Sequence, residues 1–321
     1  MESYRERLIL LLVKKKISIV TPTFNEEENI SKLCEAISKE MKTLDYDYEH
    51  IIIDNFSNDK TTDIIKKIAQ EDKRVKLIVN SRNFGHIRSS QYGILQSSGD
   101  ATILISSDFQ EPLNLIKKYI KEWENGHKIV LGQRNSSDTN KFLDTIKTMF
   151  YKFINKISDT PLIERSGSTG LISKEIVDHL RNISDPYPYL RGLLPELTAD
   201  IKLIQYHQAE RSKGFTKNNF YTLYDMAILG IIKHSKVPLR IATFLGILAS
   251  FFSILVAIVF FIYKLLFWSS FKVGIAPLVI GLFSVASIQL FLLGFIGEYV
   301  MQILIHNKNV PLVVEKERIN F

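Results

Sequence analysis

Cysteine is almost absent from this chain of 321 residues, in which Cys34 is the only one. A single cysteine excludes a framework of internal disulfide bonds and is typical of proteins that work in a reducing compartment. We also find no secretion signal, because the apolar run at residues 8–13 is too short for a signal-peptide core and is followed by three lysines. The sequence therefore predicts that the main domain lies in the cytosol.

Charge is missing from two long stretches near the C-terminal end. The 23 residues from Ile241 to Tyr263 carry none, and a helix of that length, rising about 1.5 Å per residue, would cover a hydrocarbon core roughly 30 Å thick. A second uncharged stretch runs from Val273 to Gly297, and apolar residues continue to Ile305. We expect an antiparallel hairpin of two transmembrane helices at 241–305, which returns a tail, 306–321, to the side from which the chain came.

This hairpin predicts a multi-pass protein of the plasma membrane or cell inner membrane. Two buried core helices would be the alternative, but both stretches are apolar all round. Basic residues flank the hairpin on the outside, which favours a cytoplasmic main domain with both termini cytoplasmic; they are Lys233, Lys236, Arg240, Lys308, Lys316 and Arg318. Residues 216–240 predict an interfacial amphipathic helix, with a helix packed on the domain as the alternative.

In the part before the hairpin, short β-branched runs alternate with longer amphipathic ones. The predicted strands are 17–21, 49–54, 75–79, 101–106 and 129–132, and the predicted helices are 30–42, 61–70, 87–96 and 113–125. This alternation predicts one α/β domain over residues 1–215, with a Rossmann-like and largely parallel sheet. Ligands of such sheets bind at the carboxyl ends of the strands.

Polar clusters stand where three of these strands end. Thr23–Glu26 follow the first strand, Asp54–Ser57 close the second, and Ser106–Gln110 follow the fourth. Turn formers and helix caps would explain each cluster alone equally well. Together they fit a nucleotide site, in which Asp54 would bind a base or ribose while Asp108 would meet a divalent cation and the phosphates.

At these residues the chain resembles the family 2 inverting glycosyltransferases, in particular the polyprenyl-phosphate sugar transferases related to dolichol-phosphate mannose synthase and the bactoprenol glucosyltransferases. The resemblance covers nearly the whole chain and implies a GT-A type fold. It rests on motifs at 17–26, 53–61, 81–86, 108–112, 132–134, 191–196, 211–217, 237–240 and 294–299. Each motif alone is a weak signal, but their joint order is a strong one.

The resemblance also implies roles for single residues. Those implied for donor binding are Pro22, Thr23, Asn25, Glu26, Asp54, Asn55, Asn83, Gly85, Ser107 and Asp108. Those implied for catalysis are Asp108, Arg134 and Arg191. Arg211 and Lys217 would bind the acceptor phosphate beside the membrane. A divalent cation, Mg²⁺ or Mn²⁺, would be held through Asp108 and Gln110.

Several positions depart from the family pattern. Ser106 stands where the family has the first Asp of its Asp-x-Asp motif, and Asn55 replaces the second Asp of Asp-Asp-Gly-Ser. The loss of two carboxylates weakens the predicted metal site. Phe56 replaces a glycine, and Ile87–Ser90 replace small residues. We therefore expect an altered donor pocket and leave the donor sugar open.

Taken together, the residues and the resemblance predict transfer of a sugar from a nucleotide sugar, first of all a UDP-sugar, to polyprenyl (undecaprenyl) phosphate for cell-surface glycans. An anionic phosphate acceptor needs positioning and charge neutralisation more than a strong base. The alternatives are a transferase acting on another lipid or glycan, and a non-catalytic membrane partner of a glycan assembly complex. We expect a homo-oligomer. The net charge of +7 suits anionic lipid or phosphate, and nucleic acid is not an expected partner.

Overall fold

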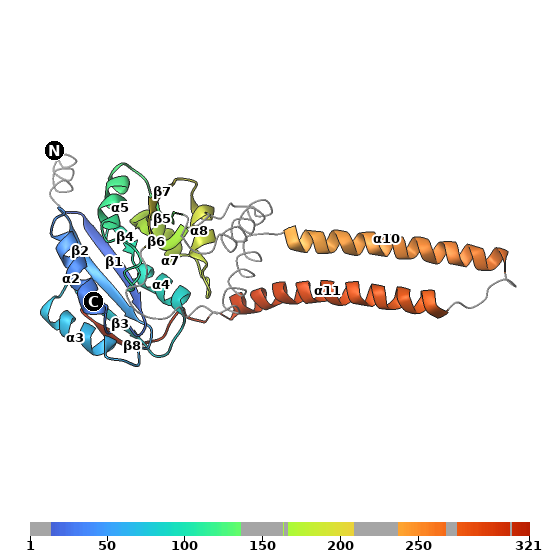
Figure 1. The fold of residues 1–321 in the computed structure, drawn as a ribbon, viewed down its shortest axis with the longest axis horizontal. Helices are drawn as coiled ribbons and strands as arrows, with labels where there is room; N and C mark the ends of the chain where they lie inside the picture. The colour runs from blue at the N-terminus through green and yellow to red at the C-terminus, as the bar shows by residue number, and fades with distance from the viewer. Residues whose placement is uncertain (1–13, 136–162, 164–165, 209–236, 268–274, 309) are drawn as a thin grey trace.

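An eight-stranded sheet lies at the centre of the domain in the computed structural model, which describes all residues except 1–13, 136–162, 164–165, 209–236, 268–274 and 309. Two long helices project away from this domain (Figure 1). The strands of the described residues are β1 (Lys16–Thr23), β2 (Asp47–Asp54), β3 (Val75–Asn80), β4 (Ala101–Leu104), β5 (Ile129–Arg134), β6 (Ser166–Ser173), β7 (Ile201–Tyr206) and β8 (Glu315–Ile319).

The strand order is β7-β5-β6-β4-β1-β2-β3-β8. Strands β3, β2, β1 and β4 are parallel neighbours, and β5 pairs in parallel with β7. Strands β6 and β8 are antiparallel to the strands beside them. The predicted α/β domain with a largely parallel sheet is therefore confirmed. Because β1, β2, β3 and β4 run the same way, their carboxyl ends meet at one edge.

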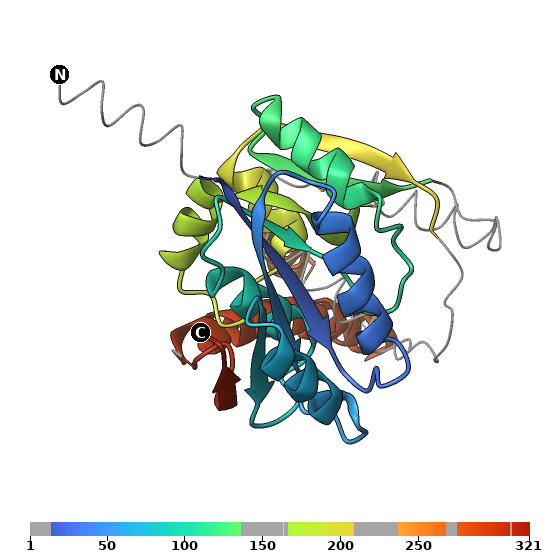
Figure 2. The same ribbon diagram turned by 90° about the vertical axis from the view of Figure 1, so that its left-hand side faces the viewer.

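Helices cover both faces of the sheet (Figure 2). Their bounds are α2 (Ile30–Met41), α3 (Thr61–Glu71), α4 (His86–Leu95), α5 (Leu115–Glu124), α7 (Lys174–Arg181) and α8 (Leu190–Leu197). Helices α2, α3 and α5 pack on one face, whereas α4, α7 and α8 pack on the other. In α2 the buried residues recur at helical spacing, so one stripe faces the sheet. Cys34 belongs to this stripe, and burial raises the pKa of its thiol to about 12.

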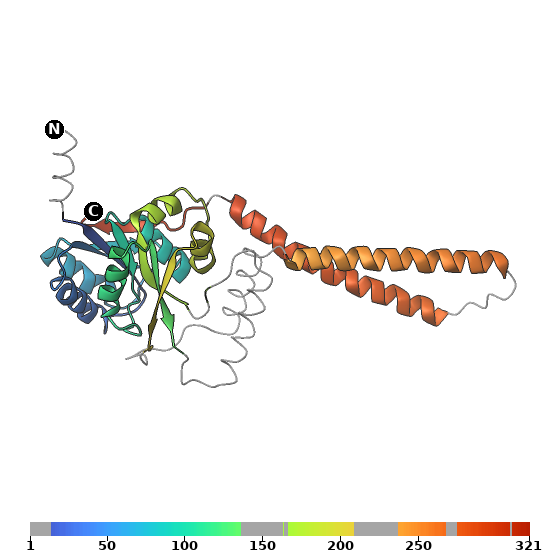
Figure 3. The same ribbon diagram turned by 90° about the horizontal axis from the view of Figure 1, so that it is seen from above.

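The projecting helices are α10 (Val237–Leu266) and α11 (Ile275–Asn307), which contact each other (Figures 1 and 3). Among the described residues, one window, Ile288–Ile305, is long and apolar enough to cross a membrane, and none of it is buried. A shorter apolar stretch, Leu239–Ala249, lies in α10. Large apolar side chains are exposed along both helices; examples are Phe244, Ile247, Phe251, Leu278 and Leu290.

After α11 the chain returns to the domain, where β8 pairs antiparallel with β3 at the edge of the sheet. The sequence had predicted only a tail at 306–321, so this strand was missed. Its residues, Glu-Lys-Glu-Arg-Ile, alternate between half-buried and exposed positions, as an edge strand with one covered face does. Strands β1 to β7, which precede the projecting helices, and β8, which follows them, thus belong to the same sheet.

Candidate functional site

Two loops at the carboxyl edge of the sheet are joined by hydrogen bonds. One follows β1 and the other follows β2. The Asn25 amide donates to Ser57 Oγ at 2.9 Å, and Asn25 Oδ1 accepts from the Asn58 amide at 2.9 Å. The Glu26 amide donates to Thr61 Oγ1 at 2.8 Å. The predicted donor residues Asn25 and Glu26 are therefore held against the loop that follows Asp54.

Asp54 is fully buried at the end of β2. Its carboxylate accepts hydrogen bonds from the amide and hydroxyl of Ser57 and from the hydroxyl of Thr62. These bonds fix the loop between β2 and α3. In this conformation Asp54 supports the loop through these bonds, and it presents no exposed oxygen to a base or ribose.

Asn55 is the centre of an amide network that reaches the next strand. Its Oδ1 accepts from Asn80 Nδ2 at 3.1 Å and from the Phe84 amide at 2.9 Å, while its Nδ2 donates to Asn83 Oδ1 at 2.8 Å. Asn83 Oδ1 also accepts from the Gly85 amide at 2.9 Å. An aspartate at position 55 could not donate to Asn83, so the amide has a structural reason to stand here.

Strained backbone gathers at the same edge. Asn25, Phe56 and Phe109, which follow β1, β2 and β4, all have positive φ, at 55°, 69° and 55°. Bulky side chains rarely adopt this left-handed conformation, and such strain is typical of functional loops. Phe56 stands where the family has glycine, the residue that adopts positive φ without steric cost. Gly85, with φ 86°, meets the same demand in the loop after β3.

Asp108 lies in the loop after β4 and is partly exposed. Its Oδ1 accepts from the Gln110 amide at 3.3 Å. The charge of Asp108 acts on His86, the first residue of α4, whose pKa is lowered by desolvation. The positive charge of Arg191 lowers the pKa of His86 further, while Asp108 opposes both effects. Asp108 and Arg191 thus both influence the protonation of His86.

The charges of Arg191 and of Arg134, the third predicted catalytic residue, both act on Tyr206. Burial raises the pKa of the Tyr206 phenol to about 12, and the positive charges of Arg134 and Arg191 both act against that rise. Arg134 Nη1 also donates to Gln208 Oε1 at 2.9 Å. Arg191 in addition lines a small, mainly apolar pocket with Leu104 and Ser166. Asp108 and Arg191 thus both act electrostatically on His86, and Arg191 and Arg134 both act on Tyr206.

Glu111 follows Asp108 by three residues in the loop after β4. Burial raises the pKa of this carboxyl group, hydrogen bonding to Ser106 opposes the rise, and the negative charge of Asp108 adds to it. The Ser106 amide donates to Glu111 Oε2 at 3.3 Å. The serine that replaces the expected aspartate is thus engaged with the neighbouring carboxyl group.

A divalent cation would find a small donor set here. No group of three His, Cys, Asp or Glu side chains that could hold a metal ion occurs in the part of the chain that the structure describes. Mg²⁺, however, is commonly bound by one or two carboxylates together with substrate phosphates. The partly exposed carboxylate of Asp108 fits that kind of binding.

The remaining predicted site residues are either buried at the ends of strands or lie outside the described residues. Pro22, Thr23 and Ser107 are buried at the carboxyl ends of β1 and β4, where they shape the loops. Arg211 and Lys217, predicted to bind the acceptor phosphate, lie outside the described residues, as does most of the predicted amphipathic helix.

Asn80 was not among the predicted site residues. This fully buried residue ends β3 and donates to Asn55 Oδ1 and to Ser89 Oγ at 3.0 Å. Its own Oδ1 has no hydrogen-bond partner within the described structure. A signal was present, because Asn80 follows an apolar strand just as the other polar residues do.

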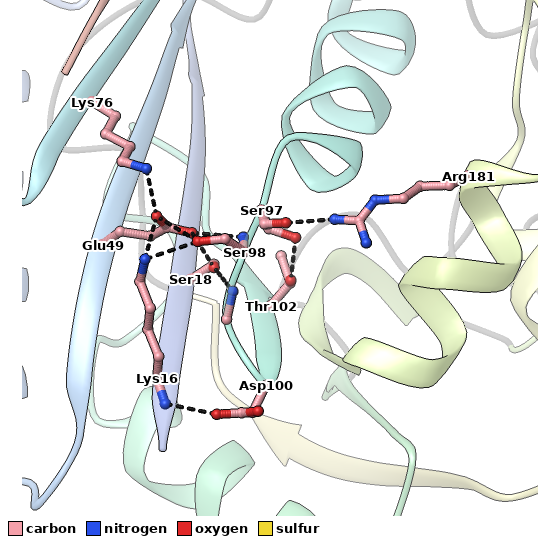
Figure 4. Close-up of polar contacts among 10 residues, drawn as sticks. Lys16, Ser18, Glu49, Lys76, Ser97, Ser98, Asp100, Thr102 and Arg181 are labelled. Atoms are coloured by element: carbon pink, nitrogen blue, oxygen red, sulfur yellow. Dashed lines mark hydrogen bonds and ion pairs between the residues drawn. The ribbon is translucent and has the colours of Figure 1, made fainter. Parts of the chain in front are cut away.

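The amino edge of the sheet carries a different polar cluster (Figure 4). Buried Glu49 accepts from Lys16 Nζ and Lys76 Nζ, both at 2.8 Å, from Ser18 Oγ at 2.6 Å and from the Ser98 amide at 2.8 Å. Burial alone would raise the pKa of Glu49, but these hydrogen bonds outweigh it and hold the pKa at about 2. Glu49 itself is buried and its partners come from different strands and from the loop before β4, so this cluster ties those elements together.

The model of glycosyl transferase family 2 matches residues 18–181. The chain is 33% identical to the putative glycosyltransferase CsbB of Bacillus subtilis, over 94% of this chain and 91% of that protein. It is 32% identical to the SfII prophage-derived bactoprenol glucosyl transferase of Shigella flexneri, over 94% of this chain and 98% of that protein.

Solved structures show more distant similarity. One is S. aureus TarS 1-349 in complex with UDP-GlcNAc, with a TM-score of 0.42 and 16% identity over 69% of this chain and 67% of that one. Another is glucosyl-3-phosphoglycerate synthase from Mycobacterium tuberculosis in complex with UDP, with a TM-score of 0.45 and 18% identity over 68% of this chain and 78% of that one.

Proposed function

This chain belongs to glycosyl transferase family 2, and on that premise we propose that it transfers one sugar from a nucleotide-sugar donor to polyprenyl (undecaprenyl) phosphate, with inversion at the anomeric carbon. That it is a glycosyltransferase follows from the family and from the relatives. The lipid acceptor is the finer part of the proposal. Its product would serve cell-surface glycan synthesis or modification.

One observation supports the proposal that the acceptor is a polyprenyl phosphate. The similarity to a bactoprenol glucosyl transferase extends over 94% of this chain and 98% of that protein, so it includes the projecting helices as well as the α/β domain. Exposed apolar side chains along α10 and α11 are consistent with a lipid environment. An enzyme anchored in this way would meet a lipid substrate at the membrane surface.

The nucleotide-sugar donor would bind at the loops that follow the carboxyl ends of β1, β2 and β3. Asn25 and Glu26 would contact the nucleotide, with a UDP-sugar as the first candidate. Asp54 and Asn55 would act mainly by holding these loops, because their side chains bond to Ser57, Thr62, Asn80 and Asn83. A loop held by internal hydrogen bonds is ordered before the donor binds, which reduces the entropic cost of binding.

The reaction itself needs charge neutralisation on both substrates. A divalent cation, Mg²⁺ or Mn²⁺, held by Asp108 with Gln110, would neutralise the diphosphate leaving group. Arg134 and Arg191 would neutralise phosphate oxygens near the reacting carbon, and Arg211 and Lys217 would hold the acceptor phosphate. The lipid phosphate is already anionic, so it can attack once it is in line, without a strong base.

The membrane arrangement is part of the proposal. Residues 1–215 would form the cytoplasmic transferase domain, 216–240 an interfacial helix and 241–305 the two-helix hairpin of a multi-pass protein in the plasma or inner membrane. The tail, 306–321, would be cytoplasmic and would contribute β8 to the domain. This arrangement is supported by β8, which pairs with β3 and so requires that the chain return to the side of the domain. A homo-oligomer is also proposed.

A direct test is to incubate membranes that contain the protein with a panel of nucleotide sugars and undecaprenyl phosphate, with and without Mg²⁺, and to identify lipid products by mass. A sugar-phosphate lipid formed by the wild type supports the proposal. A product formed only on a lipid alcohol or an oligosaccharide would replace the acceptor. Binding of labelled nucleotide sugar with no product from any acceptor would favour a non-catalytic partner.

A further inference from the structure

The segment between α11 and β8 runs along the loop that follows β3. Arg88 Nε donates to the carbonyl oxygen of Leu312 at 2.7 Å, and Arg88 Nη2 donates to that of Pro311 at 2.6 Å. The Ser81 amide donates to the carbonyl oxygen of Val314 at 2.8 Å. Residues 311–314, which follow the projecting helix, are therefore attached to Ser81 at the start of this loop and to Arg88 in the first turn of α4.

Arg88 also contacts the interior of that loop. Its guanidinium lies 5.1 Å from the centre of the Phe84 ring, and the guanidinium of Arg82 lies 4.3 Å from the same centre. Phe84 is buried, and its amide donates to Asn55 Oδ1. A continuous chain of contacts thus leads from the end of α11 through Arg88 and Phe84 to the amide network of the donor loops.

We propose that Arg88 is a positioning residue that holds the donor loop 81–86 against the segment leaving α11, so that the membrane anchor and the donor site are coupled through one side chain. This inference rests on the proposed function, because it takes the loop 81–86 as part of the donor site. It adds a link between the anchor and that site.

Arginine suits this role for a physical reason. Its planar fork can donate to two successive carbonyl groups while one face of the guanidinium lies on an aromatic ring, which a lysine ammonium cannot do. The acceptors are backbone atoms, so the contact depends on position 88 more than on the side chains of Pro311 and Leu312.

The other end of α4 provides a matched control. Arg318 of β8 donates to Gln96 Oε1 at 2.8 Å, and the Tyr92 hydroxyl donates to Glu315 Oε1 at 2.9 Å. Loss of Arg318 removes a contact between β8 and Gln96, which follows the C-terminal end of α4 and is far from Gly85 in that helix, together with the ion pair to Glu315. A general loosening of β8 should therefore follow from Arg318→Ala, and a local effect on the donor loop only from Arg88→Ala.

The test uses the full chain in lipid nanodiscs and compares wild type, Arg88→Ala, Arg88→Lys and Arg318→Ala. Hydrogen exchange of the Phe84 and Gly85 amides reports loop position without any substrate. Binding of UDP and the KM and kcat with UDP-glucose as probe report the site. We expect Arg88→Ala to speed exchange at both amides about tenfold and to raise the dissociation constant of UDP and the KM by a similar factor, with kcat and the melting temperature little changed. Arg88→Lys should recover part of the loss.

Unchanged exchange at Phe84 and Gly85 in Arg88→Ala would overturn the proposal, and so would equal effects of Arg88→Ala and Arg318→Ala. If the wild type neither binds UDP nor turns over the probe, the donor assignment fails, yet the exchange comparison still decides whether Arg88 positions the loop. The failure of the coupling and the failure of the proposed function are thus distinguishable.

Discussion

Both edges of the central sheet carry clusters of polar residues, but the two clusters differ in backbone conformation and in exposure. At the amino edge, the carboxylate of Glu49 is enclosed by two lysines and two serines. At the carboxyl edge, the loops after β1, β2 and β4 each contain a left-handed residue that is not glycine, and these three are among only four in the described residues. One edge has relaxed backbone and satisfied charges, whereas the other keeps strain and partly exposed polar groups, as a ligand site does.

The largest effect that should separate the edges is on catalysis. Asp108→Ala should reduce sugar transfer about a thousandfold or more, because a preorganised charge at the reacting centre is lost. Its unfolding free energy should change little, since the side chain is partly exposed. Transfer assays and chemical denaturation of the same preparations check this. Asp100→Ala at the amino edge, which removes the acceptor of the Lys16 amide, should lower stability and leave turnover of the folded enzyme intact. Unchanged transfer in Asp108→Ala would remove the donor-site assignment.

The second prediction concerns Glu49 and has the opposite signature. Glu49→Gln should lower the unfolding free energy at pH 7 by roughly 3 kcal/mol, since it leaves two lysines without their buried partner. Denaturant titration measures this loss. Glu175→Gln removes an exposed ion pair with Lys128 and should leave stability unchanged, because surface pairs contribute little. Equal stability of the two variants would contradict the proposed role of the buried cluster.

The pH dependence sharpens the same prediction. The folded-state pKa of Glu49, about 2, lies below its ordinary value of 4.5, so its stabilisation is fully present above pH 4.5 and is lost as the pH falls to about 2. Buried His50, whose pKa is lowered by desolvation from 6.5 to about 4, disfavours the folded state as the pH falls between these two values, because only the unfolded chain takes up the proton. Wild type should thus lose stability in two overlapping stages, and Glu49→Gln should lose only the upper one.

The third prediction tests whether a family carboxylate would suit this carboxyl edge. Asn55→Asp should destabilise the protein by roughly 1–2 kcal/mol, because its second oxygen would face Asn83 Oδ1 without a proton to share. Because the loop around Gly85 would loosen, donor affinity should fall about tenfold, which corresponds to ~1.4 kcal/mol of binding free energy. Denaturant titration and UDP binding measure the two effects. A gain in both would show that the amide is not adapted to its surroundings.

The smallest effect is the release of backbone strain. Phe56 is 40% exposed and has φ 69°, so Phe56→Gly should change stability by about 0 to +1 kcal/mol, since relief of strain is partly offset by the greater freedom of glycine in the unfolded chain. Phe109 has a similar φ but packs against the core, so Phe109→Gly should be destabilising. Calorimetric melting of both variants checks the contrast, and a clear loss of stability in Phe56→Gly would argue against strain there.

Much of the fold could be predicted because it depends on local periodicity. Strands β1, β2, β3, β4 and β5 and the helices between them lie where apolar residues recur at spacings of two or of three to four. The predicted strand at 101–106 is shorter in the structure, where β4 ends at Leu104 and the loop bends toward Phe109. Strand β6 was missed because it begins with small polar residues and is defined by its partners β4 and β5. Strand β8 was missed because its charged residues pair only with β3.

The candidate site could be predicted only in part, for a related reason. The rule that ligands bind at the carboxyl ends of parallel strands led to the prediction of Asn25, Asn55 and Asp108, and the structure has all three at that edge. It could not say which way a side chain points, and Asp54 turns inward to Ser57 and Thr62. Nor could it identify Arg88, since the partners of this side chain are backbone atoms more than 220 residues away in sequence.

The pairing of β8 with β3 also sets an order of events during biosynthesis. Asn320, just after β8, donates to the carbonyl oxygen of Val75, 245 residues earlier in the chain. Ribosomes add roughly 5–20 residues each second, and domains generally fold as they emerge. This sheet cannot do so, because its edge stays open until α10 and α11 have both been made. The edge of β3 therefore stays unpaired on the nascent chain until β8 has followed α11.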